Sequence, residues 1–175
     1  MTRTAPREEM FAPKPVPGAA LGSDDLIELL FFAYRDFVGD PDRILAEYGF
    51  GRAHHRVLHF VDRYPGLTIA ELLDILRITK QSLNRVLKDL IEQGYIEQKP
   101  GVSDRRQRLL FCTQTGARLA ADLIDVQTRR IARALAEPEA SPSASAAQEF
   151  LLAMIEPEER ASVRRLMARR DRSAS

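Results

Sequence analysis

Residues 68–94, which read TIAELLDILRITKQSLNRVLKDLIEQG, decide the fold that this sequence predicts. Thr68 followed three residues later by Glu71 forms a capping box, which begins a short apolar helix. A break at Arg77-Ile78 separates it from a second helix, which Thr79 caps and Gly94 ends. The stretch therefore predicts two short helices joined by a tight turn, which is the helix-turn-helix arrangement.

The second of these helices is amphipathic. Its apolar residues recur at i, i+3, i+4, i+7 and i+8, which predicts one buried stripe. The polar side chains of the other face gather towards its N-terminal half, where recognition helices read bases. Gln and Asn can bond adenine, Arg can bond guanine, and Lys suits phosphate. The stripe is Leu83, Val86, Leu87, Leu90 and Ile91, and the candidate DNA-binding face is Lys80, Gln81, Ser82, Asn84, Arg85 and Lys88.

A β-hairpin is predicted directly after this helix. Tyr95–Lys99 and Gln107–Thr113 have strand composition, and Pro100-Gly101 opens the turn between them. An arginine at the tip of a narrow hairpin can enter the minor groove beside a helix in the major groove. The candidate DNA contacts of this wing are Arg105, Arg106 and Arg108, and Asp104 is expected to hold its shape by pairing with Arg106.

Positive charge is concentrated in this part of the chain. The 175 residues carry a net charge of +1 and are 45% hydrophobic, so the chain can bury a core and is not a polycation. Residues 79–108 nevertheless hold seven basic and four acidic side chains and carry +3. A nucleic-acid surface would therefore be a local basic patch.

Helices are also predicted on both sides of this region. The run Leu26–Val38 is apolar on almost every side, which is typical of a helix buried in a larger body or against a second chain. Asp40-Pro41 is expected to restart a short helix. A long helix is predicted from Ala117 to about Ala136, and after a linker a last helical region from Ala146 to Arg170, which Pro157 restarts.

The fold class predicted from these patterns is mainly α with a small β-hairpin wing, a winged helix-turn-helix flanked by N- and C-terminal dimerisation helices. The predicted division is a flexible arm at 1–22, N-terminal dimerisation helices at 23–50, the DNA-binding lobe at 51–113 and C-terminal dimerisation helices at 114–172.

The last helical region contains like-charge pairs at i, i+4, Arg160 with Arg164 and Arg165 with Arg169, which are unfavourable unless a partner relieves them. An acidic patch across the dimer is the plainer explanation, and extra contact with phosphate is the alternative.

From Val57 to Thr113 the chain resembles the MarR family of winged helix-turn-helix transcription regulators. The segments that carry the resemblance agree in order and spacing, and they are Arg56-Val57-Leu58, Pro65–Leu72, Thr79–Ser82, Gly94–Glu97 and Asp104–Arg106 followed by Leu109–Thr113. The resemblance implies an interlocked homodimer, a palindromic operator in double-stranded DNA and often a small-molecule or oxidant signal. It also implies that Gln81, Ser82 and Arg85 contact or approach bases and that Arg106 is the wing arginine.

Family members bind aromatic or phenolic ligands where the dimerisation helices meet the DNA-binding lobe. By this analogy a small aromatic effector would bind a pocket in that region, while the alternative is that its residues only fill the core or the dimer interface. The candidate pocket residues are Tyr34, Phe37, His54, His55 and Leu58.

A histidine pair and the single cysteine are candidate sites. His55 and His59 stand four apart, a spacing that suits zinc, but no Glu follows the first and only Cys112 is a soft ligand elsewhere. We therefore expect structural or pocket-lining histidines, with no metal and no cofactor. Cys112, in a predicted wing strand beside Phe111, is interpreted as a packed thiol rather than an oxidant sensor.

The sequence thus predicts a transcription regulator that acts on a promoter as a repressor or an activator. The alternative is a winged-helix module for protein–protein contact without direct DNA binding. No Ser/His/Asp set, Gly-rich phosphate loop or carboxylate pair stands out, so no enzyme is expected. The absence of a signal peptide and of an apolar run of about 20 residues predicts a cytoplasmic protein that binds no membrane, and the single cysteine agrees with a reducing compartment.

Overall fold

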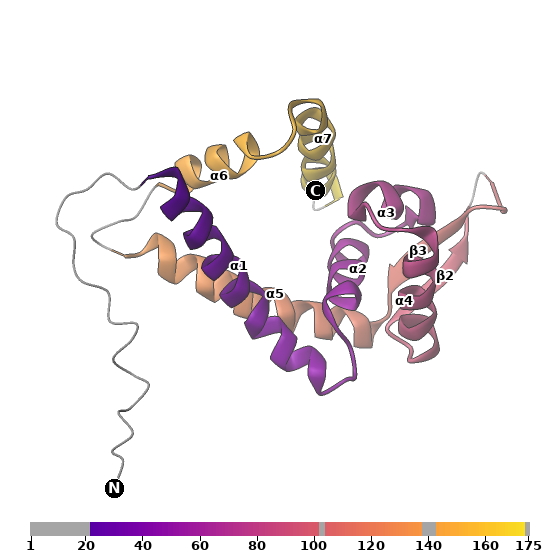
Figure 1. Ribbon diagram of the computed structural model, residues 1–175. Helices are drawn as coiled ribbons and strands as arrows, with labels where there is room; N and C mark the ends of the chain where they lie inside the picture. The colour runs from indigo at the N-terminus through magenta and orange to yellow at the C-terminus, as the bar shows by residue number, and fades with distance from the viewer. Residues whose placement is uncertain (1–21, 102–103, 138–142, 174–175) are drawn as a thin grey trace, which may run out of the picture. The chain divides into compact units, whose positions relative to one another are not determined.

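The computed structural model describes residues 22–101, 104–137 and 143–173 (Figure 1). The predicted flexible arm therefore lies outside the described residues, apart from its last position. The chain divides into two units, residues 1–35 and 36–175. Most described residues are helical, and three short strands form one sheet. None of the helices among the described residues is both long enough and apolar enough to cross a membrane.

Helix α1 (Ser23–Ala46) is continuous, so the prediction of a new helix at Asp40-Pro41 is wrong. Proline inside a helix removes one hydrogen bond and crowds the preceding turn. Here the Pro41 side chain is fully buried, as is Leu45 one turn later, and that burial offsets the lost bond. The helix ends at a turn in which Gly49 has a positive φ of 69°.

The core of the second unit lies among α2 (Arg52–Arg63), α3 (Ile69–Leu76), α4 (Lys80–Glu92) and the sheet. Val57, Leu58 and Val61 of α2 are completely buried. Arg56 Nη2 of α2 donates to the carbonyl oxygen of Leu76 at 2.7 Å, so it satisfies one of the carbonyl groups that the end of α3 leaves open.

The local signals of the helix-turn-helix are confirmed. The backbone N–H of Thr68 donates to Glu71 Oε2 at 2.8 Å, and the N–H of Glu71 donates to Thr68 Oγ1 at 3.2 Å. Thr79 Oγ1 caps α4 by accepting from the N–H of Ser82 at 3.2 Å. Gly94 follows α4 with a φ of 76°, as its role at the helix end requires.

The predicted hairpin is confirmed as β2 (Ile96–Pro100) and β3 (Arg108–Cys112), which pair antiparallel with Gln98 opposite Leu110. A third strand, β1 (Leu67–Thr68), pairs with the other edge of β3, so the order is β1-β3-β2. The sequence predicts a cap at Thr68 and no strand at these two residues. A strand of two residues is too short to show an alternating pattern.

Three helices follow the sheet. Thr113 caps α5 (Gln114–Leu135) by accepting from the N–H of Gly116 at 3.1 Å. The predicted last helical region consists of α6 (Ala144–Ala153) and α7 (Pro157–Ser173), and α7 begins at the proline that was expected to restart it. In Figure 1, α7 lies beside α3.

Candidate nucleic-acid interface

Helix α4 separates its apolar and polar residues as predicted. Leu83, Val86, Leu87 and Leu90 are buried, with exposed fractions of 6% or less. Because α4 packs against α2 and β2, this stripe fixes which side of the helix faces outward. All six predicted DNA-binding side chains of the helix lie exposed, namely Lys80, Gln81, Ser82, Asn84, Arg85 and Lys88.

The first turn of α4 places a polarised hydroxyl at its surface. Thr79 Oγ1 donates to Ser82 Oγ at 2.9 Å while it also accepts from the N–H of Ser82. The Ser82 hydroxyl accepts from Thr79 in this arrangement, and the Ser82 side chain is exposed. The positive end of the helix dipole lies at the same turn, so this end of α4 favours an anion.

The loop of the wing is held by its backbone. Asp104 Oδ1 accepts from the backbone N–H of Arg106 at 2.9 Å, and the N–H of Gln107 donates to the carbonyl oxygen of Asp104 at 3.1 Å. Asp104 thus pairs with Arg106 through the main chain of Arg106. The sequence predicts a pairing of these two residues but not which atoms form it. A Cβ atom added at Gly101 would lie only 2.7 Å from the carbonyl oxygen of Asp104. A larger residue at this position would therefore displace the turn. Arg105, Arg106 and Arg108 are exposed.

The acidic side chains of this region are largely engaged. Glu92 pairs with Lys88 at 3.8 Å and Glu97 with Lys99 at 2.7 Å. Asp89 Oδ2 lies 3.3 Å from His54 Nε2. Within the described part of the chain, several cations of α4 and the wing form no ion pair, which leaves the interface positive, and these are Lys80, Arg85, Arg105, Arg106 and Arg108.

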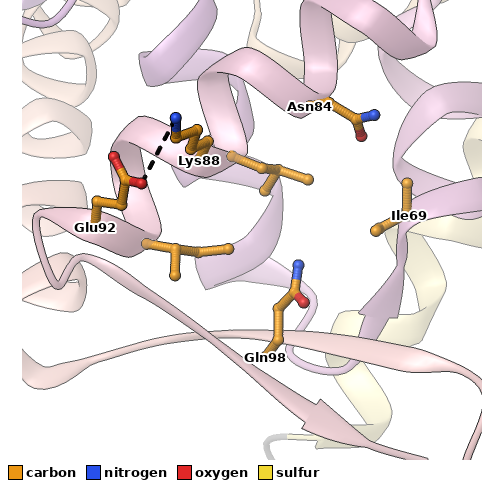
Figure 2. A pocket seen from close by; sticks show the side chains of 7 residues that line it. Ile69, Asn84, Lys88, Glu92 and Gln98 are labelled. Carbon is orange, nitrogen blue, oxygen red and sulfur yellow. Dashed lines mark ion pairs between the residues drawn. The ribbon is translucent and has the colours of Figure 1, made fainter.

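A cavity of about 300 Å³ lies between α4 and β2 (Figure 2). Asn84 and Lys88 border it from α4, and Gln98 points into it from β2. Two of the predicted contact residues therefore stand at the rim of a depression rather than on a flat surface. Its remaining lining residues are Ile69, Leu87, Ile91 and Glu92.

The residues of the predicted effector pocket are spread over several environments. Leu58 is completely buried in the core, and the His54 ring stacks on Phe50 with 4.7 Å between ring centroids. Tyr34 belongs to the first unit, and Phe37 and His55 are half-buried in the second. Neither of the two cavities described here is lined by any of these residues. The pocket stays a prediction.

A different cavity, of about 640 Å³, lies between the C-terminal half of α1 and α5. Asp40 is held there by Arg130, whose Nη2 lies 2.7 Å from Asp40 Oδ2, and by Arg43. The hydrogen bond from Arg130, followed by the charges of Arg43 and Arg133, keeps the pKa of Asp40 low despite its desolvation. This cavity was not predicted from the sequence, although Arg129 and Arg133 are one turn apart on a predicted helix. The lining is Asp40, Arg43, Ile44, Val126, Arg129, Ala132 and Arg133.

A group of titratable side chains on α2 and β3 is partly buried. Burial lowers the pKa of His59 to about 4 and also lowers the pKa of His55. Burial raises the pKa of Asp62 and, together with the charge of Asp62, raises that of Cys112 to about 12. Cys112 Sγ lies 3.9 Å from the carbonyl oxygen of Leu58. Among the residues that the structure describes, no three His, Cys, Asp or Glu side chains are grouped to hold a metal ion.

A helix-turn-helix followed by a small antiparallel wing defines a winged-helix protein. The sequence profile of the MarR family matches residues 48–107. The HTH-type transcriptional regulator PetP of Rhodobacter capsulatus is 48% identical over 132 residues, which cover 75% of this chain and 78% of that protein. The chain belongs to the MarR family of transcriptional regulators, as the resemblance in the sequence implied.

Solved structures show the same fold. The transcriptional regulator SlyA superimposes with a TM-score of 0.61 at 18% identity, covering 74% of this chain and 91% of that one. MarR of Staphylococcus aureus, solved in complex with salicylate and kanamycin, gives a TM-score of 0.60 at 23% identity and covers 78% of this chain and 90% of that one. The predicted fold class, mainly helical with a small wing, is confirmed.

Proposed function

We propose that this regulator binds double-stranded DNA with α4 in the major groove and the wing in the adjacent minor groove. The observation that carries the proposal is the outward face of α4, where Gln81, Ser82 and Arg85 are exposed while the apolar stripe is buried. Bidentate bonds from Gln and Arg read adenine and guanine in the major groove. The free cations of the wing supply contacts to phosphate and to the minor groove.

The same proposal includes a homodimer on a palindromic operator. Residues 26–34 of α1 carry apolar side chains that are 45–69% exposed, among them Phe31 and Phe32. Phe150 and Leu151 of α6 are also more than half exposed. Large exposed apolar patches mark interaction surfaces. A two-fold dimer would place two copies of α4 in successive major grooves, about 34–36 Å apart.

This arrangement assigns a role to each segment of the chain. We assign residues 51–113 to the DNA-binding lobe, and residues 23–50 and 114–172 to dimerisation. The similar proteins of known role are transcriptional regulators, and we propose no catalytic activity. Such a protein would act where the chromosome lies, which in a bacterium is the cytoplasm.

Binding to a mixed-sequence duplex at several salt concentrations tests the proposal. The logarithm of the affinity should fall by about 0.9 for each phosphate contact per unit of log salt. Sedimentation of the free protein and of the complex measures the number of subunits. An affinity that does not change with salt concentration would contradict DNA binding. It would favour the alternative, a winged-helix module that contacts another protein.

We propose further that an organic anion controls the regulator through the cavity between α1 and α5. Its volume falls in the range of about 300–1,000 Å³ that is usual for ligand pockets. Ile44 and Val126 offer an apolar surface, and Arg133 offers charge for a carboxylate, while Arg129 at the same rim pairs with Asp125 at 3.0 Å. Salicylate, which is bound in the solved S. aureus MarR, has this chemistry.

Thermal melting with salicylate tests this control. Salicylate should raise the Tm of the wild type and weaken its binding to DNA, because a ligand that prefers one state shifts the population towards it. Arg133→Ala should abolish both effects, whereas Arg118→Ala, an exposed arginine elsewhere on α5, should retain them. An equal response in both variants would place the ligand elsewhere.

A further inference from the structure

Helix α7 is attached to both ends of α3. At the C-terminal end of α3, Arg77 Nη2 donates to Glu159 Oε1 at 2.6 Å. At the N-terminal end, Glu71 Oε1 accepts from Arg169 Nη1 at 3.0 Å. Leu166, between these two ion pairs on α7, packs against the core. The first turn of α7 therefore lies beside Arg77, in the turn that precedes α4, and its C-terminal part lies beside the start of α3.

Arg77 has an unusual backbone conformation for its type. Its φ of 51° and ψ of 45° are left-handed, and within the described ranges it is the one residue other than glycine with a positive φ. This conformation is unfavourable for an L-residue, whereas glycine adopts it freely at helix ends. An arginine at such a position indicates that its side chain has a function of its own.

The position of Arg77 in the helix-turn-helix favours contact with phosphate. It lies two residues before Thr79, which caps the N-terminus of α4. In this motif the first helix crosses the DNA backbone and the N-terminal residues of the second contact the bases. A cation at the junction of the two helices is therefore placed near the backbone, and the Arg77 side chain is 67% exposed.

The first turn of α7 is acidic where it meets Arg77. Glu158 and Glu159 lie in this turn, and its basic residue, Arg160, is directed elsewhere. Arg160 donates to the carbonyl oxygens of Ile155, at 2.8 Å, and Ala153, at 2.7 Å, and so closes the end of α6. The turn therefore presents negative charge to Arg77 and repels phosphate.

We propose that Arg77 is a further phosphate-contacting residue and that Glu159 competes with DNA for its guanidinium. The Arg77–Glu159 pair is exposed on both sides, at 67% and 41%, and pairs of this kind contribute little to stability. Exchanging the carboxylate for a phosphate therefore needs little energy. Helix α7 thereby restrains DNA affinity from within the chain. This inference rests on the DNA binding proposed above.

The test measures binding of the full-length protein to one mixed-sequence duplex at fixed, moderate salt. Glu159→Gln removes the competing charge, and Glu158→Gln is the matched control, one residue away in the same helical turn. Both are compared in the wild-type background and in the Arg77→Ala background. Glu159→Gln should bind about two- to fivefold more tightly than Glu158→Gln, because exposed pairs are worth up to about 1 kcal/mol. This difference should vanish in the Arg77→Ala background.

Two results would overturn the inference. Equal affinities of Glu159→Gln and Glu158→Gln would show that only net charge matters, and a gain that persists in the Arg77→Ala background would show that Arg77 is not the group released. Salt-independent binding of the wild type would instead contradict the proposed DNA binding itself, so the two failures can be told apart.

Discussion

Gly116, in the first turn of α5, lies directly against the backbone carbonyl of Tyr95, which precedes β2. The N–H of Thr113 donates to the same carbonyl oxygen at 3.0 Å, and the Thr113 hydroxyl donates to the carbonyl oxygen of Gly94 at 2.7 Å. The start of α5 is thus joined through backbone contacts to the junction between α4 and the wing. We therefore expect a displacement of α5 to move the lobe that we propose to bind DNA.

Gly116→Ala tests this junction. A methyl group on Gly116 would overlap the Tyr95 carbonyl oxygen, and backbone must move to admit it. We expect a loss of about 1–3 kcal/mol in the free energy of unfolding, measured by urea denaturation. Gly39→Ala in α1 is the control, because nothing lies within 4 Å of the added Cβ, and it should be neutral or stabilising. Equal stability of the two variants would mean that the backbone at this junction can move to admit the methyl group without a loss of stability.

Arg106→Ala tests the wing. The side chain is exposed, so the variant should melt at the wild-type temperature. Its affinity for DNA should fall by about 1–3 kcal/mol if the guanidinium enters the minor groove. Fluorescence anisotropy and thermal melting measure the two quantities. A clear drop in Tm would show instead that Arg106 supports the fold.

His59 should make stability depend on pH. Burial lowers its folded pKa to about 4, whereas the unfolded chain titrates near its ordinary value of 6.5. Between these values the unfolded state binds the extra proton, so the free energy of unfolding falls as the pH decreases from 6.5 to 4. The loss from this group is on the order of 2–3 kcal/mol.

His59→Gln carries no titrating ring and should flatten that dependence. Urea denaturation at pH 7.5, 6.0 and 5.0 measures it, and the difference between wild type and variant isolates His59 from the carboxylates that also titrate in acid. The stability difference between wild type and variant should change steadily with pH. A constant difference would mean that the imidazole is solvated in the folded state.

Cys112 should be unreactive in the folded protein. Its pKa of about 12 leaves almost no thiolate at pH 8, and the thiolate is the reactive form. Iodoacetamide should therefore label Cys112 slowly in native protein and rapidly in guanidinium chloride, as followed by mass spectrometry. Rapid labelling of the native protein would restore the oxidant-sensing interpretation.

The helix-turn-helix was predictable because its signals are local. The pair Thr68 and Glu71, the cap Thr79 and the terminating Gly94 each act within a few residues. The continuity of α1 through Pro41 was not predictable, because the local sequence does not show that the proline side chain is buried.

The arginines of α7 show the same limit. Their spacing predicts partners, either an acidic patch across the dimer or phosphate, and both remain predictions. Within the chain, Arg169 pairs with Glu71, 98 residues away, and Arg160 bonds the carbonyl groups at the end of α6. The pattern showed that these cations needed partners. The partners could not be identified from the spacing of residues within α7, because they depend on tertiary contacts.

If the outward face of α4 reads base sequence, selection from a pool of random duplexes should detect it. We expect an enriched site with two inverted halves, centred about 10–10.5 base pairs apart or a multiple of that distance. Arg85→Ala should lose about 1–3 kcal/mol of affinity for this site, and Arg118→Ala should lose none. A pool that yields no enriched sequence, or an Arg85→Ala variant that binds the site as the wild type does, would contradict it.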